Sequence, residues 1–209
     1  MKLLLTSNGI SNKKLRSEFL SMIGMRASNV KILMIQTSSM TKKGMKYVNS
    51  AIRKLTNTGV LRENIDVTDF RKKISYDRLK NYDVVYVCGG NTFYILHWAR
   101  KSGFVSSVKN FLKDGKLYIG SSAGSNIACQ TIEMVIWKHS DRNMIGLKDL
   151  TAMNLVPFMI VAHYTKRYQK AIKKAVSKNG YSVKPIRDGQ AISVRGNKIK
   201  FIGKEIKVQ

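Results

Sequence analysis

A serine flanked by small residues follows a short apolar segment near the middle of the chain. Leu117-Tyr-Ile119 is typical of a buried strand, and residues 125–130 are typical of the first turns of a helix. The residues between them, Gly120-Ser-Ser-Ala-Gly124, fit the pattern Gly-x-Ser-x-Gly, which places a serine on a sharp turn from strand to helix. Small neighbours allow the close backbone approach that such a strained turn requires. We therefore predict that Ser122 is a nucleophile.

A second small-residue turn, Gly89-Gly-Asn91, follows the apolar segment 83–88. Its glycines allow the backbone to approach a negative charge closely. The N–H groups of Gly90 and Ala123 would then form an oxyanion hole, with one donor next to the nucleophile and the other from a separate loop. Alternatively, this is an ordinary turn in which Asn91 caps the following helix. The two interpretations are compatible, and Asn91 is also a candidate substrate-binding residue.

One of the three histidines is suitably placed to act as a base. His97 falls within a predicted helix and His139 in an irregular segment, whereas His163 closes the predicted strand 157–162. Ligands of parallel sheets bind at the carboxyl ends of the strands, where Ser122 is also expected. We therefore predict that His163 takes the serine proton and later donates it to the leaving group.

The carboxylate that would orient His163 is less well defined by the sequence. No Asp or Glu occurs from residue 151 to residue 187. The acidic candidates on either side are Glu133, Asp141, Asp149 and Asp188. Each of them could equally be a surface charge or a turn former, so the residues themselves leave the choice open.

The elements that must position these side chains alternate between strands and helices. Predicted strands lie at residues 2–6, 31–36, 65–68, 83–88, 117–119 and 157–162, with helical spacing of apolar residues between most of them. This order predicts an α/β fold with a doubly wound, mostly parallel sheet. Further strands are expected at 181–186, 191–194 and 198–202, and the last two form a C-terminal β-hairpin. We expect residues 1–209 to form a single domain.

The chain is strongly basic, with 38 Lys and Arg against 12 Asp and Glu and a formal net charge of +26. Such a charge attracts polyanions, including nucleic acid. The basic residues are scattered, however, and no nucleic-acid-binding motif is present. We therefore favour the interpretation that lysines simply fill solvent-facing positions. No apolar run approaches the roughly 18 residues of a membrane span. The two cysteines show no disulfide or zinc pattern, which favours the cytoplasm. A homodimer is one alternative for the oligomeric state.

Four motifs in order resemble those of the peptidase E family, the S51 group of serine peptidases that contains aspartyl dipeptidases and cyanophycinases. They are Gly89-Gly-Asn-Thr-Phe93, the serine turn, Ala162-His-Tyr164 and Arg187-Asp-Gly-Gln-Ala191, and the opening Lys2–Ser7 is also similar. The resemblance covers nearly the whole chain. It implies a three-layer fold of the class I glutamine-amidotransferase-like (flavodoxin-like) type and no metal or organic cofactor.

The resemblance also implies roles for individual residues. Ser122 and His163 match the family's nucleophile and base, and Gly90 and Ala123 match its oxyanion donors. Family members carry the third triad member in the loop after the serine turn. That window runs here from residue 137 to residue 141, and Asp141 is its only carboxylate.

Asp141 is therefore the predicted acid, and Asp188 is the second choice and a candidate substrate-binding residue. Trp137 stands where some family members carry their acid.

Family aspartyl dipeptidases hold the N-terminal aspartate of the substrate with basic groups. Arg167 could clamp a carboxylate here because its guanidinium binds bidentately, although a solvated helix face is an equal alternative. The expected function is hydrolysis of small peptides through an acyl-enzyme on Ser122. The alternatives are an impaired family member that binds a small anionic ligand and a nucleic-acid-associated protein. A class I amidotransferase is excluded because its turn would carry cysteine.

Overall fold

The computed structural model of the chain describes residues 1–36 and 42–207. Its main feature is a seven-stranded sheet with the order β3-β2-β4-β5-β1-β8-β9. The strands are β1 (Lys2–Thr6), β2 (Ile32–Gln36), β3 (Ile65–Asp69), β4 (Val84–Val87), β5 (Leu117–Ser121), β8 (Ala191–Arg195) and β9 (Lys198–Ile202). The first five strands in the sheet order are parallel to each other, whereas β8 pairs antiparallel with both β1 and β9. The predicted mostly parallel α/β fold with a C-terminal hairpin is confirmed.

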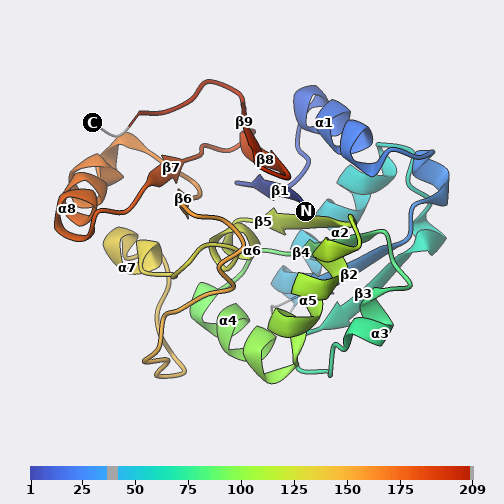
Figure 1. Cartoon of the computed structure of the whole chain (residues 1–209), viewed down its shortest axis with the longest axis horizontal. Coiled ribbons are helices and arrows are strands. Elements are labelled where there is room, and N and C mark those ends of the chain that lie inside the picture. The colour runs from blue at the N-terminus through green and yellow to red at the C-terminus, as the bar shows by residue number, and fades with distance from the viewer. Residues whose placement is uncertain (37–41, 208–209) are drawn as a thin grey trace.

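Helices cover both faces of this sheet. The α-helices of the described residues are α1 (Lys13–Ile23), α2 (Lys42–Thr56), α3 (Tyr76–Leu79), α4 (Thr92–Lys101), α5 (Phe104–Lys113), α6 (Ala123–Asn126), α7 (Met134–Lys138) and α8 (Gln169–Asn179). The buried residues of α1 and α2 pack on one face, and those of α4 and α5 pack on the other (Figure 1). Within the described residues, no helix has both the length and the apolar character needed to cross a membrane.

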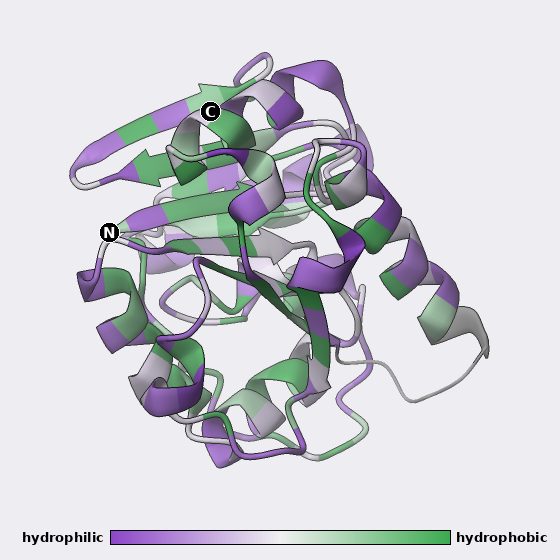
Figure 2. Cartoon of the chain, turned by 90° about the vertical axis from the view of Figure 1, so that its right-hand side faces the viewer, coloured by the Kyte–Doolittle hydropathy of each residue, from purple (hydrophilic) through white to green (hydrophobic). Residues whose placement is uncertain are grey.

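The two-sided core follows from the alternation of side chains along each strand. In β1, Leu3 and Leu5 join the core under α4 and α5, while Leu4 joins the core under α1 and α2. Each strand in the middle of the sheet is therefore apolar on both faces, which explains the continuous apolar runs in the sequence. Figure 2 shows the helices alternating between hydrophobic and hydrophilic residues, as expected when one side of a helix is buried.

The strands predicted near residues 157–162 and 181–186 form outside the main sheet. They are β6 (Met159–Val161) and β7 (Val183–Pro185), which pair parallel with each other and are connected through α8. This pair lies beside α6, next to the carboxyl ends of β1 and β5 (Figure 1). It carries the segment that ends at His163.

The helix after the serine turn is shorter than the sequence indicates. A helix through residue 130 was expected, but α6 ends at Asn126. The carbonyl groups of residues 127–130 accept hydrogen bonds from the N–H groups of residues 152–155 instead of continuing the helix. The apolar residues of segment 127–130 are therefore buried by an irregular, strand-like contact with segment 152–155. The helical spacing of the sequence does not predict this contact.

Two glycines let the turn between β5 and α6 pack backbone against backbone. A Cβ atom added to Gly124 would lie 2.3 Å from the carbonyl oxygen of Val87 in β4. A Cβ atom added to Gly120 would lie 2.7 Å from the backbone of Gly124. Because the main-chain atoms of β4 and of the start of α6 cannot move aside cheaply, both positions require glycine.

We expect Gly124→Ala to lower the free energy of unfolding by about 3 kcal/mol or more, since the added methyl group overlaps the β4 backbone. The matched control is Gly115→Ala, at a φ of 75° with open space around it. That change should cost only about 1 kcal/mol, from left-handed strain alone. Denaturant unfolding followed by circular dichroism measures both, and equal losses would contradict the packing argument.

Candidate active site

The serine turn is a single residue between a strand and a helix. β5 ends at Ser121 and α6 begins at Ala123, so Ser122 alone makes the reversal. Its backbone has φ 53° and ψ −112°, a conformation that residues with a side chain rarely adopt. A local strain of this kind persists only when the surrounding contacts hold it.

The end of β1 provides those contacts. The carbonyl oxygen of Thr6 accepts the N–H of Ser122 at 3.0 Å and the hydroxyl of Ser125 at 2.8 Å. The Thr6 hydroxyl donates to the carbonyl of Gly120 at 2.8 Å. Thr6 is fully buried, so these bonds are shielded from competing water. β1 therefore holds the turn on both sides of Ser122.

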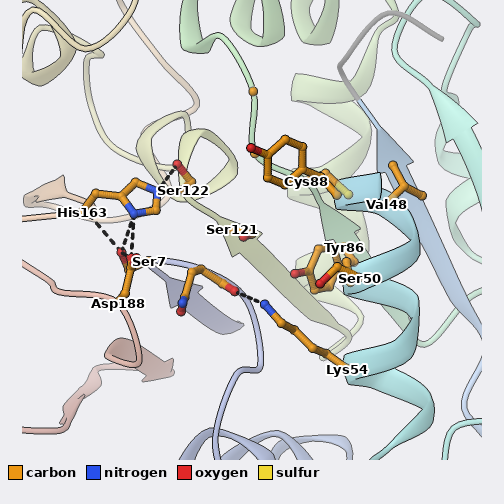
Figure 3. Close-up of a pocket in the computed structure, with 15 residues that line it drawn as sticks. Ser7, Val48, Ser50, Lys54, Tyr86, Cys88, Ser121, Ser122, His163 and Asp188 are labelled. Atoms are coloured by element: carbon orange, nitrogen blue, oxygen red, sulfur yellow. Dashed lines mark hydrogen bonds and ion pairs between the residues drawn. The ribbon is translucent and has the colours of Figure 1, made fainter. Parts of the chain in front are cut away.

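Ser122, His163 and Asp188 form a continuous chain of hydrogen bonds (Figure 3). Ser122 Oγ lies 2.9 Å from Nε2 of His163, and Nδ1 of His163 lies 2.6 Å from Oδ1 of Asp188. Because an ionised carboxylate only accepts hydrogen bonds, Nδ1 carries the proton in the second contact. Nε2 is then left to accept the proton of the serine hydroxyl.

Ser7 is a fourth member of this arrangement and is not among the predicted site residues. Its hydroxyl donates to Oδ1 of Asp188 at 2.6 Å and accepts the backbone N–H of His163 at 2.9 Å. Ser7 is fully buried and directly follows β1. Two sequence signals point to Ser7: its position at the carboxyl end of a predicted parallel strand, and its place in the segment Lys2–Ser7 that resembles the peptidase E family.

The pairing of β6 with β7 explains why His163 and Asp188 meet. Val161 lies opposite Pro185 in this parallel pair, and the two chains remain bonded beyond the strands, with Tyr164 N–H donating to Ile186 O at 3.0 Å. The residues that follow the two strands therefore emerge side by side. β8 then begins next to the end of β1, because the two strands are antiparallel, and this keeps residue 188 at the same edge as Ser7.

Asp141, the predicted partner of His163, does not fill that position. Its Oδ2 accepts the backbone N–H of Thr92 at 2.8 Å, at the start of α4. The Nδ1 atom of His163 is bonded to Asp188 instead. The structure thus corrects the choice of carboxylate: a helix N-terminus engages Asp141, while the second choice, Asp188, lies at the histidine.

The remaining acidic candidates are engaged elsewhere. Glu133 accepts a hydrogen bond from the hydroxyl of Tyr181 at 3.2 Å. Asp149 pairs with Arg100 at 2.9 Å. Neither contact involves His163.

A pocket of about 670 Å³ opens beside Ser122. Ser122, His163 and Asp188 lie on one side of it, and side chains of α2, including Val48 and Lys54, lie on the opposite side (Figure 3). Lys54 donates to the carbonyl oxygen of Asn8 at 2.9 Å. It is the only lysine or arginine among the residues that line this pocket in the described part of the chain.

The double glycine predicted to face the nucleophile does so. Gly89 and Gly90 both line the pocket, and a Cβ atom added to Gly89 would lie 3.2 Å from the Cβ atom of Ser122. Gly90 has a φ of 153°. Ala123 is the first residue of α6, so its N–H has no acceptor within the helix.

Two predicted substrate-binding residues lie away from the pocket lining. The side chain of Asn91 caps α4 by accepting the N–H of Tyr94 at 3.1 Å, and it donates to the carbonyl of Arg142 at 2.8 Å. Arg167 is exposed and stacks on Tyr168, with its guanidinium carbon 4.6 Å from the ring centroid. Both side chains thus have local structural partners.

The two cysteines are unsuited to act as nucleophiles. Cys88 lines the pocket, and burial raises the pKa of its thiol to about 12. Burial raises the pKa of Cys129 to about 12 as well. Both thiols therefore stay protonated near neutral pH, and the thiolate is the reactive form. Within residues 1–36 and 42–207, no group of three or more His, Cys, Asp and Glu side chains is arranged to hold a metal ion.

Comparison with known proteins places this geometry in a family. Residues 3–202 match the model of peptidase family S51. An uncharacterized peptidase of Pasteurella multocida, PM1590, is 32% identical over 177 residues, which cover 83% of this chain and 85% of that protein. Peptidase E of a Nostoc strain is 40% identical over 91 residues, covering 44% of this chain and 36% of that protein.

A solved structure also resembles this chain in its fold. A crystal structure from Listeria monocytogenes EGD-e, described as a candidate peptidase E, superposes with a TM-score of 0.79 and 26% identity. The superposition covers 99% of this chain and 98% of the other. The family match and the relatives together show that this chain is a member of peptidase family S51, a family of serine peptidases.

Proposed function

We propose that this protein hydrolyses small peptides through an acyl-enzyme on Ser122, with His163 as general base and Asp188 as the third member of a catalytic triad. The observation that carries this proposal is the hydrogen-bonded chain from Ser122 Oγ through the imidazole to the carboxylate. A nucleophile, a base in contact with it and a group that orients the base are the parts that acyl transfer needs.

In the proposed reaction, Ser122 Oγ attacks the peptide carbonyl carbon while its proton passes to Nε2 of His163. The N–H groups of Gly90 and Ala123 are the proposed donors to the resulting oxyanion. The imidazolium then gives its proton to the leaving amine, and the acyl-enzyme forms. A water molecule then attacks the acyl carbon while His163 takes its proton. The imidazolium returns that proton to Ser122 Oγ as the bond to the acid product breaks, which restores the free serine.

Ser7 has a distinct part in this mechanism because the site is open. The side chains of His163 and Asp188 are 46% and 57% exposed, so solvent screens the attraction between them. Hydrogen bonding must therefore fix the orientation of the carboxylate. The buried Ser7 hydroxyl, which donates to Asp188 and accepts from the His163 backbone, supplies that constraint.

We further propose that the preferred peptides begin with aspartate and that Lys54 binds the acidic side chain. The ammonium group of Lys54 has three donors, and its bond to the Asn8 carbonyl uses one of them. A substrate carboxylate in the pocket can accept from the others. Lys54 replaces Arg167 as the proposed anchor because Arg167 does not line the pocket. The two unpaired, buried cysteines suit a cytoplasmic location.

The proposed activity is tested with a panel of dipeptides, Asp-X beside Glu-X, Asn-X and Ala-X, in which release of free amino acids is measured. We expect turnover of Asp-X to be fastest. Ser122→Ala should lower kcat by about 10⁴-fold or more, because the acyl-enzyme cannot form. A folded wild-type protein that releases no amino acid from any dipeptide would contradict the proposal and favour a non-catalytic family member that binds a small anionic ligand.

If Lys54 binds the acidic side chain, its loss should lower the preference for Asp-X over Ala-X. Lys54→Met should raise KM for Asp-X by about 10-fold or more, the effect of losing a hydrogen bond to a charged group, and leave Ala-X nearly unchanged. Lys46→Met, an exposed lysine on the same helix, is the matched control and should change neither substrate. A parallel loss for Asp-X and Ala-X in Lys54→Met would mean that Lys54 only supports the loop at Asn8.

A further inference from the structure

A buried lysine lies behind the candidate active site and has no role in the mechanism above. Lys138 ends α7 and is 9% exposed. Among the described residues, no carboxylate lies within ion-pair distance of its ammonium group. Burial is the main reason that its pKa is lowered from the ordinary lysine value. An ammonium group held in this way is costly, so its contacts must account for it.

Lys138 has one direct hydrogen-bond acceptor, a backbone carbonyl, and one aromatic contact. Its Nζ donates to the carbonyl oxygen of Ala162 at 2.5 Å and lies 5.2 Å from the ring centroid of Tyr168. Three more distant charges act on the ammonium group. The carboxylates of Asp141, after α7, and Asp188, after β7, attract it, and Arg167, in the short helix η3 (Lys166–Tyr168), repels it. The ring supplies a cation–π contact, and the carbonyl is the direct acceptor.

The Ala162 carbonyl belongs to the peptide group that precedes His163. The N–H at the other end of that same peptide group donates to the hydroxyl of Ser7 at 2.9 Å. Both ends of the peptide are therefore bonded to side chains from other elements. This matters because His163 itself has a φ of 54°, a left-handed conformation that a histidine adopts only when contacts hold it.

We propose that Lys138 is a positioning residue that, together with Ser7, holds the peptide group before His163 so that the imidazole faces Ser122. The inference rests on the proposed function of His163. Lys138 does not line the pocket and so does not contact the substrate. Its influence passes through the backbone of the base. Residues 137–141, where the resemblance predicts the triad acid, thus supply a buried cation, Lys138, next to Trp137 instead.

If the ammonium form of Lys138 holds this peptide group, kcat should fall as the pH rises. The ammonium form donates the stronger hydrogen bond, and it is present below the pKa of Lys138. Because burial lowers that pKa, the hold on Ala162 weakens at a lower pH than for an exposed lysine. We therefore expect kcat to decline on the alkaline side below the range in which exposed lysines titrate.

The test compares Lys138→Met, Lys138→Arg and the exposed control Lys166→Met in the full chain. Lys138→Met should lower kcat by about 10- to 100-fold with KM nearly unchanged, the effect of a misplaced base. Lys138→Arg keeps the charge and should recover most of the loss and extend activity to higher pH. Lys166→Met should match wild type. Thermal unfolding of each variant establishes that it is folded.

A substrate-free measurement separates this inference from the proposed function. Long-range ¹H–¹⁵N correlation spectra, assigned with His163→Gln, report which ring nitrogen of His163 carries the proton. Wild type should carry it on Nδ1, and Lys138→Met should show a mixture of the two tautomers. That mixture would support the inference even if no peptide were hydrolysed. A folded Lys138→Met with the wild-type tautomer, or with wild-type kcat, would overturn it.

Discussion

The candidate site depends on the position of β1 between β5 and β8. The parallel contact places Thr6 beside Ser121, so the end of β1 holds the strained backbone of Ser122. The antiparallel contact places Thr6 beside Ala191, so the segment just before β8 reaches the same edge of the sheet. Ser7 then follows β1 into the space between the two and bonds to Asp188. One central strand therefore sets the distance between Ser122 and Asp188.

His163 reaches this edge by a different route, which explains why its backbone needs contacts of its own. It follows β6, which belongs to the small sheet with β7 rather than to the main sheet. In the described part of the chain, β6 does not pair with a strand of the main sheet, so that sheet does not set the position of His163 relative to Ser122. Instead, the peptide before it is bonded to Ser7 and Lys138, and its ring is bonded at both nitrogens. Ser122 is thus positioned by backbone contacts at the end of β5, whereas His163 is positioned by hydrogen bonds to side chains.

The sequence was sufficient to predict the fold and to select Ser122 and His163, whose side chains the structure brings into contact. Each of these predictions depends on local pattern: alternating strands and helices, a small-residue turn and a strand-ending histidine. The third residue depended on chain direction. Asp188 precedes a strand, and only the antiparallel entry of β8 brings the beginning of that strand to the carboxyl end of β1. The family resemblance favoured Asp141, which in fact accepts the N–H of Thr92 at the start of α4. Ser7 and Lys138 make hydrogen bonds to groups distant in sequence, the Asp188 carboxylate among them, and composition carries no signal for such contacts.

The most direct test of this account is the rate at which a serine-directed fluorophosphonate modifies Ser122, measured by mass spectrometry of the intact protein and its peptides. We expect modification at Ser122 in wild type and at a similar rate in Asp141→Asn. The rate should be lower by about 10³-fold or more in Asp188→Asn, because the imidazole would lose the partner that fixes its tautomer. Rapid modification in folded Asp188→Asn together with its loss in folded Asp141→Asn would contradict the assignment of Asp188 as the partner of His163.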